Sequence, residues 1–443
     1  MSRPVHRVAP TTDLPIRQDS LRAHNLGLTF QQIVGARRVP ISRSELAAAT
    51  GLTRPTISRI VDDLLAGGLI VESGPSRSGN SGRPRVGLRL AHTGPAGLGL
   101  DIRGNSLSAC VVDLTGAVRH LGFAAHTEDE LDPGRTLGRL AAMARDAIQL
   151  AAAAGLTVVG ATLAAPGPVQ DGSVVRLAPS LGWRDVDAGA ALRSGIATAG
   201  LPVLVDNDAS LAALGESYAG GPGLRDFVCV CGEFDIGAGI VLAGLPMRGS
   251  RGWSGELGHI MVESDGKRCC CGATGCLQRY AGLRDILDAV PAAPAVPRQA
   301  PAVAIDALVS AGSPDILVSL ESAGKALGVA IAALVNIVDV DTVLLGGSYS
   351  LLTSWLTDGI EAEVNRRVLT AGWAPITVRP ATLGPDAAVI GAALSAVDRV
   401  RRDPNSWLAR SDALAQDVQG ADVGEAGPVV IPAGVPGRRR RGP

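Results

Sequence analysis

The chain has 443 residues, enough for roughly three folding units and a large hydrophobic core. Hydrophobic residues make up 46% of it and charged residues 19%, with a net charge of -1, so the totals exclude a disordered chain and a uniformly basic nucleic-acid coat. The positive charge is concentrated at one end. Residues 1–90 hold 13 Arg, no Lys and 6 acidic residues, a formal +7 that leaves -8 for the remainder and predicts a nucleic-acid surface near the N-terminus.

Neither a membrane span nor a signal peptide is predicted. The most apolar stretches, residues 151–165 and 326–340, are interrupted by Gly, Thr, Asn or Asp before they reach the roughly 18 apolar residues that a membrane helix needs. The first residues lack the apolar core of a signal peptide. We therefore expect a cytoplasmic protein, in which seven cysteines favour a metal or free thiols over disulfides.

Two short helices are predicted in the basic N-terminal unit. Ser42 and Glu45 have the spacing of a capping box, which begins a helix that should end at Gly51, because glycine adopts the left-handed conformation found at helix ends. Thr53 can cap a second helix, with Pro55 tolerated in its first turn. The apolar residues of this second helix recur at helical spacing and should face inward: Ile57, Ile60, Val61, Leu64 and Leu65.

The pattern is typical of a winged helix. Two helices joined by a tight glycine turn, the second with a polar outer face, form a helix-turn-helix. Strands at 69–72 and 86–90 follow, joined by a basic turn that can reach phosphate or a minor groove. The alternative is a small helical domain whose arginines only solvate it. We favour DNA binding because caps, apolar stripe, outer face and basic turn agree. The predicted DNA contacts are Arg43, Thr53, Arg54, Thr56, Ser58, Arg59, Arg83 and Arg85.

Residues 41–47, 51–58 and 82–84 resemble the winged helix of repressors in the ROK family, which comprises bacterial sugar-responsive repressors and sugar kinases. Kinases of that family lack this domain. The resemblance extends over residues 42–398 and is carried further by the segments described next.

Two segments correspond to the places where actin-like kinases hold nucleotide phosphates. Residues 98–105 contain Asp101 and lead into a predicted strand, but Arg103 stands where the family's kinase pattern, D-x-G-G-T, has its first Gly. In the second segment the family has G-T-G-I-G-G-G, whereas this chain has Phe234 for the Thr and Asp235 for a phosphate-facing Gly. A carboxylate about 4 Å from a phosphate oxygen costs roughly 4 kcal/mol at an effective dielectric constant near 20, so we expect ATP to be disfavoured.

A predicted buried strand at 203–206 ends in Asn207 and Asp208, before a helix that runs through Glu216. Polar side chains at the carboxyl end of a strand are where ligands bind in α/β sheets, although Asp208 could instead cap the following helix. The resemblance implies that Asp208 is the proton-accepting base in kinases and a sugar hydrogen-bond acceptor in repressors, with Asn207 beside it. Asp208 therefore does not decide between the two functions.

A zinc site is predicted from His259, Cys269, Cys271 and Cys276, because three thiols and an imidazole in a glycine-rich loop form a tetrahedral ligand set. The alternative is a turn of small apolar cysteines. Cys270 is left out because the middle side chain of a C-x-C pair generally points away. Three further cysteines lie in apolar strands and are interpreted as core residues: Cys110, Cys229 and Cys231.

The resemblance implies that the metal is structural and that Glu256 and His259 border the sugar. Two further sugar contacts depart from the family pattern, since Ser180 replaces a usual Asn and Gln278 a usual Glu. Compared with the charged Glu, a Gln keeps one acceptor and adds two N–H donors, which changes the sugar hydroxyls that it can satisfy. We therefore expect the pocket to bind a different ligand.

The predicted fold class is α/β, with a winged helix-turn-helix at 20–90 and a two-lobed, actin-like ROK domain (a ribonuclease H-like fold) at 96–400 that contains a zinc loop at 256–278. Residues 1–19 and a Pro/Gly/Arg-rich tail at 401–443 are expected to be disordered. The resemblance implies that a last helix, at 387–397, returns to the first lobe.

The predicted function is that of a sugar-responsive transcriptional regulator, more specifically a repressor, acting as a homodimer or homotetramer on a double-stranded DNA operator, with structural Zn²⁺ and a small sugar as ligands. One alternative is an ATP-dependent sugar kinase with Asp208 as its catalytic base. Another alternative is that the pocket binds no ligand and that the ROK domain serves only to oligomerise the DNA-binding unit.

Overall fold

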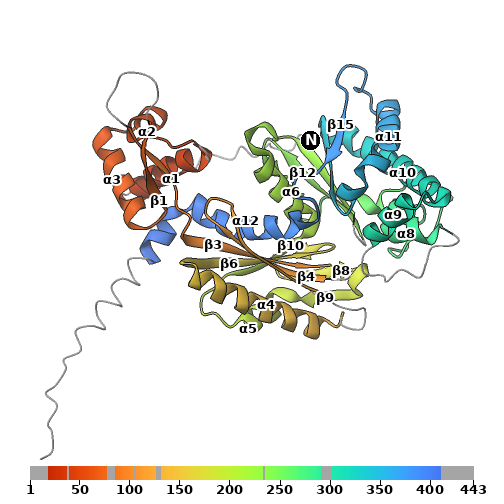
Figure 1. Ribbon diagram of the computed structural model, residues 1–443, viewed down its shortest axis with the longest axis horizontal. Helices are drawn as coiled ribbons and strands as arrows, with labels where there is room; N and C mark the ends of the chain where they lie inside the picture. Colours follow the sequence, from red (N-terminus) through yellow and green to blue (C-terminus); the bar gives the residue numbers. More distant parts are fainter. Residues whose placement is uncertain are drawn as a thin grey trace, which may run out of the picture.

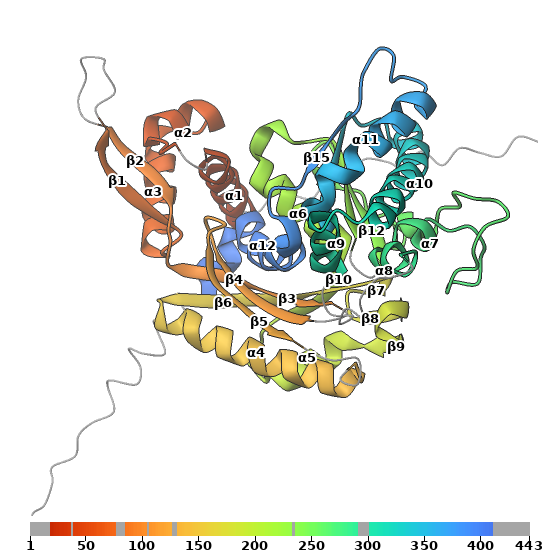
Figure 2. The same ribbon diagram turned by 45° about the vertical axis from the view of Figure 1, so that its right-hand side comes forward.

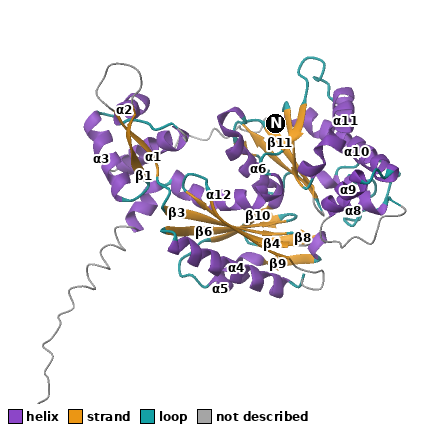
Figure 3. Cartoon of the chain, in the orientation of Figure 1, coloured by secondary structure: helices purple, strands orange, loops and turns teal. Residues whose placement is uncertain are grey.

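The computed structural model describes residues 18–36, 39–76, 85–103, 106–125, 131–232, 235–290 and 301–410. Figure 1 shows three bodies: a small N-terminal unit, a first lobe built on a sheet with helices on both faces, and a second lobe with its own sheet. The same helices and strands are distinguished by colour in Figure 3.

The N-terminal unit is a winged helix. It contains α1 (Gln18–Ala36), α2 (Arg43–Thr50) and α3 (Arg54–Ala66), followed by the antiparallel strands β1 (Ile70–Ser76) and β2 (Arg85–Leu90). The predicted capping box of Ser42 and Glu45 is confirmed, as are the left-handed Gly51 (φ 72°) and the Thr53 cap. No helix was predicted where α1 lies; its buried Leu26, Phe30 and Ile33 pack on the apolar stripe of α3.

The first lobe has a five-stranded sheet in the order β10 (Val203–Asn207), β6 (Leu156–Ala165), β3 (Gly94–Ile102), β4 (Ser106–Asp113) and β5 (Val118–Ala125). β3, β4 and β5 are antiparallel, whereas β6 and β10 run parallel to β3. Figure 3 shows α4 (Pro133–Ala153) and α5 (Ala188–Ile196) on one face and α12 (Ala387–Arg402) on the other. A small sheet of β7 (Val169–Gln170), β8 (Val174–Ala178) and β9 (Trp183–Asp187) adjoins it, with a turn of 3₁₀ helix, η2 (Pro179–Leu181), before β9.

The second lobe has a sheet in the order β13 (Leu245–Pro246), β12 (Ile236–Leu242), β11 (Phe227–Gly232), β14 (Thr342–Gly347) and β15 (Thr377–Pro380). α6 (Asp208–Gly220) packs on β11 and β12, and the lobe's main core lies beneath the remaining helices. These are α7 (Gln278–Ala281), α8 (Leu283–Asp288), α9 (Pro301–Ser310), α10 (Pro314–Val338) and α11 (Tyr349–Arg367); short 3₁₀ turns are η3 (Gly221–Gly223), η4 (Leu257–His259) and η5 (Gly384–Asp386).

α10 is long enough, and apolar enough on average, to cross a membrane. No membrane span was predicted there, because polar residues interrupt its apolar stretch. Half of its most apolar 18-residue window is buried, and the helix packs along α11. Its apolar side chains form much of the second lobe's core, so α10 is accounted for as a core helix.

α12 joins all three bodies. The predicted return of the last helix to the first lobe is confirmed, because α12 lies on β3 so closely that a Cβ on Gly97 or Gly99 would be 2.0 Å from a backbone oxygen of the helix. α12 also crosses α6, where a Cβ on Gly391 would lie 1.8 Å from the carbonyl oxygen of Leu211. Figure 2 shows α12 between α1 and α6, above the sheet of the first lobe.

The predicted tail begins later than residue 401. Residues 404–410 form a further helical turn, here called the C-terminal segment, whose Trp407 and Leu408 pack in the core of the winged helix. The Trp407 indole N–H donates to the carbonyl oxygen of Gly67 at 2.8 Å. The rest of the predicted tail, including the Arg438–Arg441 run, lies outside the described residues.

Candidate functional site

The predicted DNA-contacting helix presents a polar face. Arg54 and Arg59 are exposed on α3, and Thr56 and Ser58 are half-buried between them. The Thr53 hydroxyl is 2.8 Å from that of Thr56, so part of Thr53's hydrogen-bonding capacity is used in capping α3.

The other predicted DNA contacts lie away from this face or outside the described residues. Arg43 forms ion pairs with Asp62 at 3.1 Å and Glu72 at 2.9 Å, which tie α2 to α3 and β1. Arg83 lies outside the described residues, and for Arg85 the structure describes the backbone only.

A cleft lies between the two lobes. The first lobe contributes Asp101 at the end of β3 and Ser180 in η2, whereas the second contributes Asp235 before β12 and Gly347 at the end of β14. Asp208, at the start of α6, lies on the cleft wall, together with Pro385 of η5. The cleft is therefore formed at the carboxyl ends of strands in both sheets, where α/β proteins bind ligands.

Arg103 occupies the first phosphate segment. Its Nε donates to the Oδ2 of Asp101 at 2.7 Å, and its guanidinium also donates to the carbonyl oxygen of Pro385 in η5, just before α12. Burial raises the pKa of Asp101, and the neighbouring Arg103 opposes this shift. The segment thus carries a guanidinium that bridges β3 and η5.

Asp208 is held at the N-terminus of α6, where the backbone N–H of Ala209 donates to its Oδ1 at 2.7 Å. Burial raises the pKa of Asp208 to about 8, with further contributions from the negative charges of Asp101, Asp235 and Glu256. The pKa of Glu256 is also raised, by burial and by Asp235. Several acidic side chains therefore lie in or beside the cleft, and their carboxyl groups resist ionisation.

Asp235 connects the lobes across the cleft. Ser180, on the facing lobe, lies close enough to its carboxylate to favour the ionised form through its hydroxyl and its backbone N–H. Its Oδ2 is buried and accepts no hydrogen bond from the described residues. Burial raises its pKa, which the Ser180 bonds and the nearby His259 partly offset.

Two predicted ligand residues have structural partners. The Asn207 side chain accepts from the backbone N–H of Ser210 at 3.0 Å and donates to the carbonyl oxygen of Gly167 at 3.2 Å. Gln278 is buried, and its Oε1 accepts from the backbone N–H of Ile236 at 2.8 Å, which ties α7 to β12 beside the cleft. Both stay predictions as sugar ligands.

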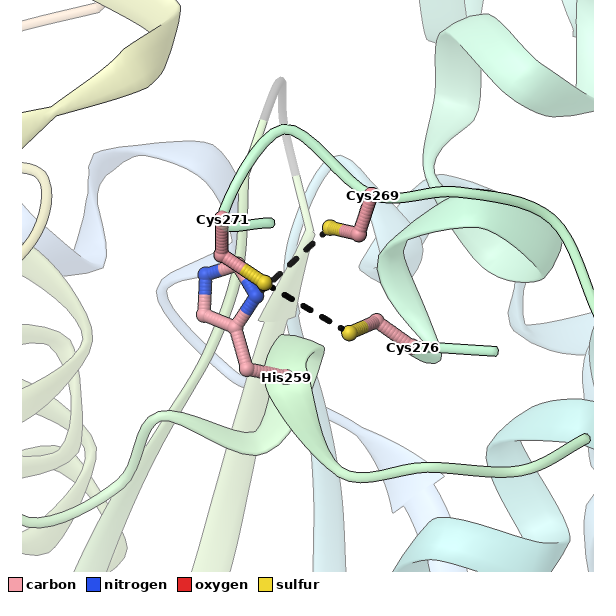
Figure 4. A group of neighbouring side chains, drawn as sticks. All are labelled: His259, Cys269, Cys271 and Cys276. Carbon is pink, nitrogen blue, oxygen red and sulfur yellow. Dashed lines mark hydrogen bonds between the residues drawn. The ribbon is translucent and has the colours of Figure 1, made fainter. Parts of the chain in front are cut away.

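The predicted metal ligands converge. Figure 4 shows His259, Cys269, Cys271 and Cys276 pointing toward one another, and their ligand atoms all lie within 4.8 Å. The Cys269 Sγ is 3.8 Å from the His259 Nδ1, and the Cys271 and Cys276 sulfurs are 3.7 Å apart. These separations suit a tetrahedral ion with sulfur ligands at about 2.3 Å. A turn places them there: the N–H of Cys269 donates to the carbonyl oxygen of Ala273, and Gly275 (φ 75°) passes so close to Glu263 that a Cβ would clash.

The sequence analysis missed two features beside the cleft. Cys231, interpreted as a core residue, is half-buried and lines the cleft, whereas Cys110 and Cys229 are buried. Glu216 is fully buried, and its carboxylate accepts from the backbone N–H groups of Thr382 at 2.8 Å and Leu383 at 2.6 Å. Glu216 thereby holds the loop before η5 to α6. The only sequence feature that could have indicated this role is the position of a glutamate on an apolar face of the predicted helix.

The structure resembles a crystal structure of a ROK family transcriptional regulator described as a homolog of the E. coli Mlc protein, with a TM-score of 0.71, 27% identity, and coverage of 86% of this chain and 97% of that one. The xylose repressor of Bacillus subtilis is 25% identical over 86% of this chain and 97% of its own length. A glucokinase of Streptomyces coelicolor is 29% identical over 67% of this chain and 96% of its own length.

The kinase match covers a smaller share of this chain, 67%, than the 86% covered by each of the two regulators. A MarR family model matches residues 29–79, which contain α2 and α3. The ROK family model matches residues 97–399, more than half of the chain. The chain therefore belongs to the ROK family and carries an N-terminal winged helix of the MarR type.

Proposed function

We propose that this protein is a sugar-responsive transcriptional repressor that binds operator DNA through α3 and whose operator affinity changes when a sugar binds between the lobes. The observation that carries the proposal is the continuity of the winged helix with the ROK domain. One hydrophobic core contains Phe30 and Leu64 of the winged helix together with Val397 and Val400 of α12. Relatives named xylose repressor support a sugar as the effector.

α12 is suited to carry the signal. Its N-terminal end follows η5, which Arg103 contacts in the cleft, and its C-terminal end carries Arg401, whose carbonyl oxygen accepts from Gln31 of α1 at 2.5 Å. A rearrangement of the lobes around a sugar therefore moves the surface on which the winged helix rests. A coupling free energy of about 1–3 kcal/mol, typical of allosteric pairs, changes operator affinity about 5- to 150-fold.

Kinase activity is the second candidate, which Asp208 and the glucokinase relatives favour. Two observations argue against it. Arg103 fills the first phosphate segment, and Asp235 places a carboxylate in the second. We therefore propose that the protein is not an enzyme. A coupled assay for ADP release over a panel of hexoses tests this; turnover that Asp208→Asn abolishes would refute it.

Zn²⁺ would be held by His259, Cys269, Cys271 and Cys276, whose arrangement fits it. Four protein ligands leave no open position, so the ion would order the loop that carries Glu256 and His259 beside the cleft and take no part in chemistry. We further propose that the protein acts as a homodimer or homotetramer, because a two-fold operator requires paired winged helices.

Operator binding is the first experiment. Fluorescence anisotropy on the DNA upstream of the protein's own gene, at near-physiological salt, should show binding about a thousandfold tighter than to unrelated DNA. Arg59→Ala should weaken it by about 1–3 kcal/mol if the side chain reads a base. Arg366→Ala, an exposed arginine on α11, is the matched control and should bind normally. An absence of preference for any upstream sequence would refute the proposal.

A further inference from the structure

The cleft is lined by carboxyl groups with little positive charge beside them. Asp101, Asp208 and Asp235 line it, and Glu256 lies close enough to affect the pKa of Asp208. Arg103 forms an ion pair with Asp101. Among the described residues no lysine or arginine forms an ion pair with Asp208, Asp235 or Glu256. Burying carboxylates without cations is costly, so this arrangement needs a reason beyond folding.

Asp235 is the clearest example, in the described part of the chain, of a buried carboxyl group without an ion-pair partner. Ser180 lies beside its carboxylate and favours the ionised form. The carboxylate oxygen Oδ2 is buried and accepts no hydrogen bond from the described residues, while the residue lines the cleft. A buried acceptor with no partner costs about 1–3 kcal/mol, and more when it is charged. A ligand that donates to Oδ2 would recover that free energy.

We propose that the cleft binds an amino sugar, with the protonated amine of the ligand donating to Asp235. The proposal rests on the proposed function, because it names the class of sugar that the regulator senses. A phosphorylated sugar is disfavoured at this position by the same carboxylates, and a neutral hydroxyl would satisfy Oδ2 without offsetting the charge.

An ammonium group fits this position better than a divalent cation does. It offers three N–H donors and no acceptor, which suits a pocket whose unsatisfied groups are acceptors. Mg²⁺ requires octahedral oxygen coordination. Here Asp101 is engaged by Arg103 and one oxygen of Asp208 by Ala209, while Ser180 lies beside Asp235. The acceptor that remains without a partner among the described residues is Asp235 Oδ2, which can take one N–H from an amine.

Calorimetry on the full-length protein tests the proposal. The probes are D-glucosamine and 3-amino-3-deoxy-D-glucose, each compared with D-glucose and N-acetyl-D-glucosamine, and magnesium chloride alone. Wild type should bind at least one amino sugar about tenfold or more tightly than its neutral counterparts, because a charge-assisted hydrogen bond replaces a neutral one. Asp235→Asn keeps the shape of the side chain and should bring the amino and neutral sugars to within about threefold. Asp358→Asn removes a carboxylate from the exposed surface of α11 and should change nothing.

The outcomes separate the two proposals. Neutral sugars bound as tightly as amino sugars would overturn the amine assignment, and so would a preference that persists in Asp235→Asn. Binding of magnesium that depends on Asp235, without amino sugar binding, would identify a cation site instead and also overturn it. The proposed regulatory function is judged separately by anisotropy: it fails if the protein has no operator, whatever the calorimetry gives.

Discussion

Gln31 of α1 donates a hydrogen bond of 2.5 Å to the carbonyl oxygen of Arg401, the penultimate residue of α12. On the same residue, the buried guanidinium donates to the carbonyl oxygen of Leu114 at 2.8 Å and lies 4.7 Å from the ring centre of Tyr218 on α6. Arg401 therefore contacts the winged helix, the first lobe and a helix of the second lobe. The proposed rearrangement of the lobes would act on this junction.

The C-terminal segment gives the first prediction. Trp407→Ala removes the hydrogen bond to Gly67 and an apolar contact with the winged helix, which should cost about 1–3 kcal/mol of stability. Sugar affinity should stay unchanged, because the cleft is at the other end of α12, while the effect of sugar on operator affinity should fall severalfold. Anisotropy with and without sugar measures this. Trp373→Ala is the matched control, since that indole is 84% exposed.

Arg103 gives the second prediction. Arg103→Ala leaves Asp101, which is 1% exposed, without its ion pair, and such a loss costs about 3–5 kcal/mol in a buried site. The cost arises from the ionised form of Asp101, so the difference in melting temperature between variant and wild type should shrink as the pH falls toward 4. An equal difference at pH 4 and pH 8 would mean that Arg103 stabilises the protein by packing alone.

Asp208 gives the third prediction. Its pKa is about 8 in the folded protein and near 3.8 when unfolded, so the folded state holds the proton more tightly. The resulting stability is fully present below the unfolded pKa and is lost as the pH rises through about 8. Asp208→Asn removes this dependence. The variant should melt a few degrees higher than wild type at pH 8.5, with the gap closing toward pH 4, in a series of calorimetric scans. A gap that is the same at every pH would show that Asp208 does not titrate in this range.

The winged helix was predictable because its signals are local. Ser42, Glu45, Gly51 and Thr53 each fix a helix end through contacts within four residues, and the structure contains all of them. The cysteine cluster was predictable for a similar reason, since the four ligands lie within 18 residues.

Long-range pairings were not predictable in the same way. Nothing near Arg103 in the sequence indicates that its guanidinium reaches Pro385, 282 residues away. Gln278 was predicted as a sugar contact, and nothing near it in the sequence indicates that its Oε1 also accepts from the backbone N–H of Ile236, 42 residues away. Trp407 was assigned to a tail because the Pro/Gly-rich composition around it outweighs one aromatic residue, and only the core of the winged helix reveals its partner.

The cysteine cluster gives the last prediction. Elemental analysis of protein purified without chelator should give about one Zn²⁺ per chain, and Cys271→Ala should lose it, because three ligands bind a structural zinc far less tightly than four. Cys270→Ala is the matched control: Cys270, which adjoins Cys271 in the sequence, is exposed and outside the ligand set, so the zinc content should stay at wild-type level. The loss of zinc should loosen the loop that carries Glu256, so sugar affinity should fall in Cys271→Ala while binding to operator without sugar persists. If Cys270→Ala releases the ion and Cys271→Ala retains it, the ligand set has been assigned to the wrong cysteine.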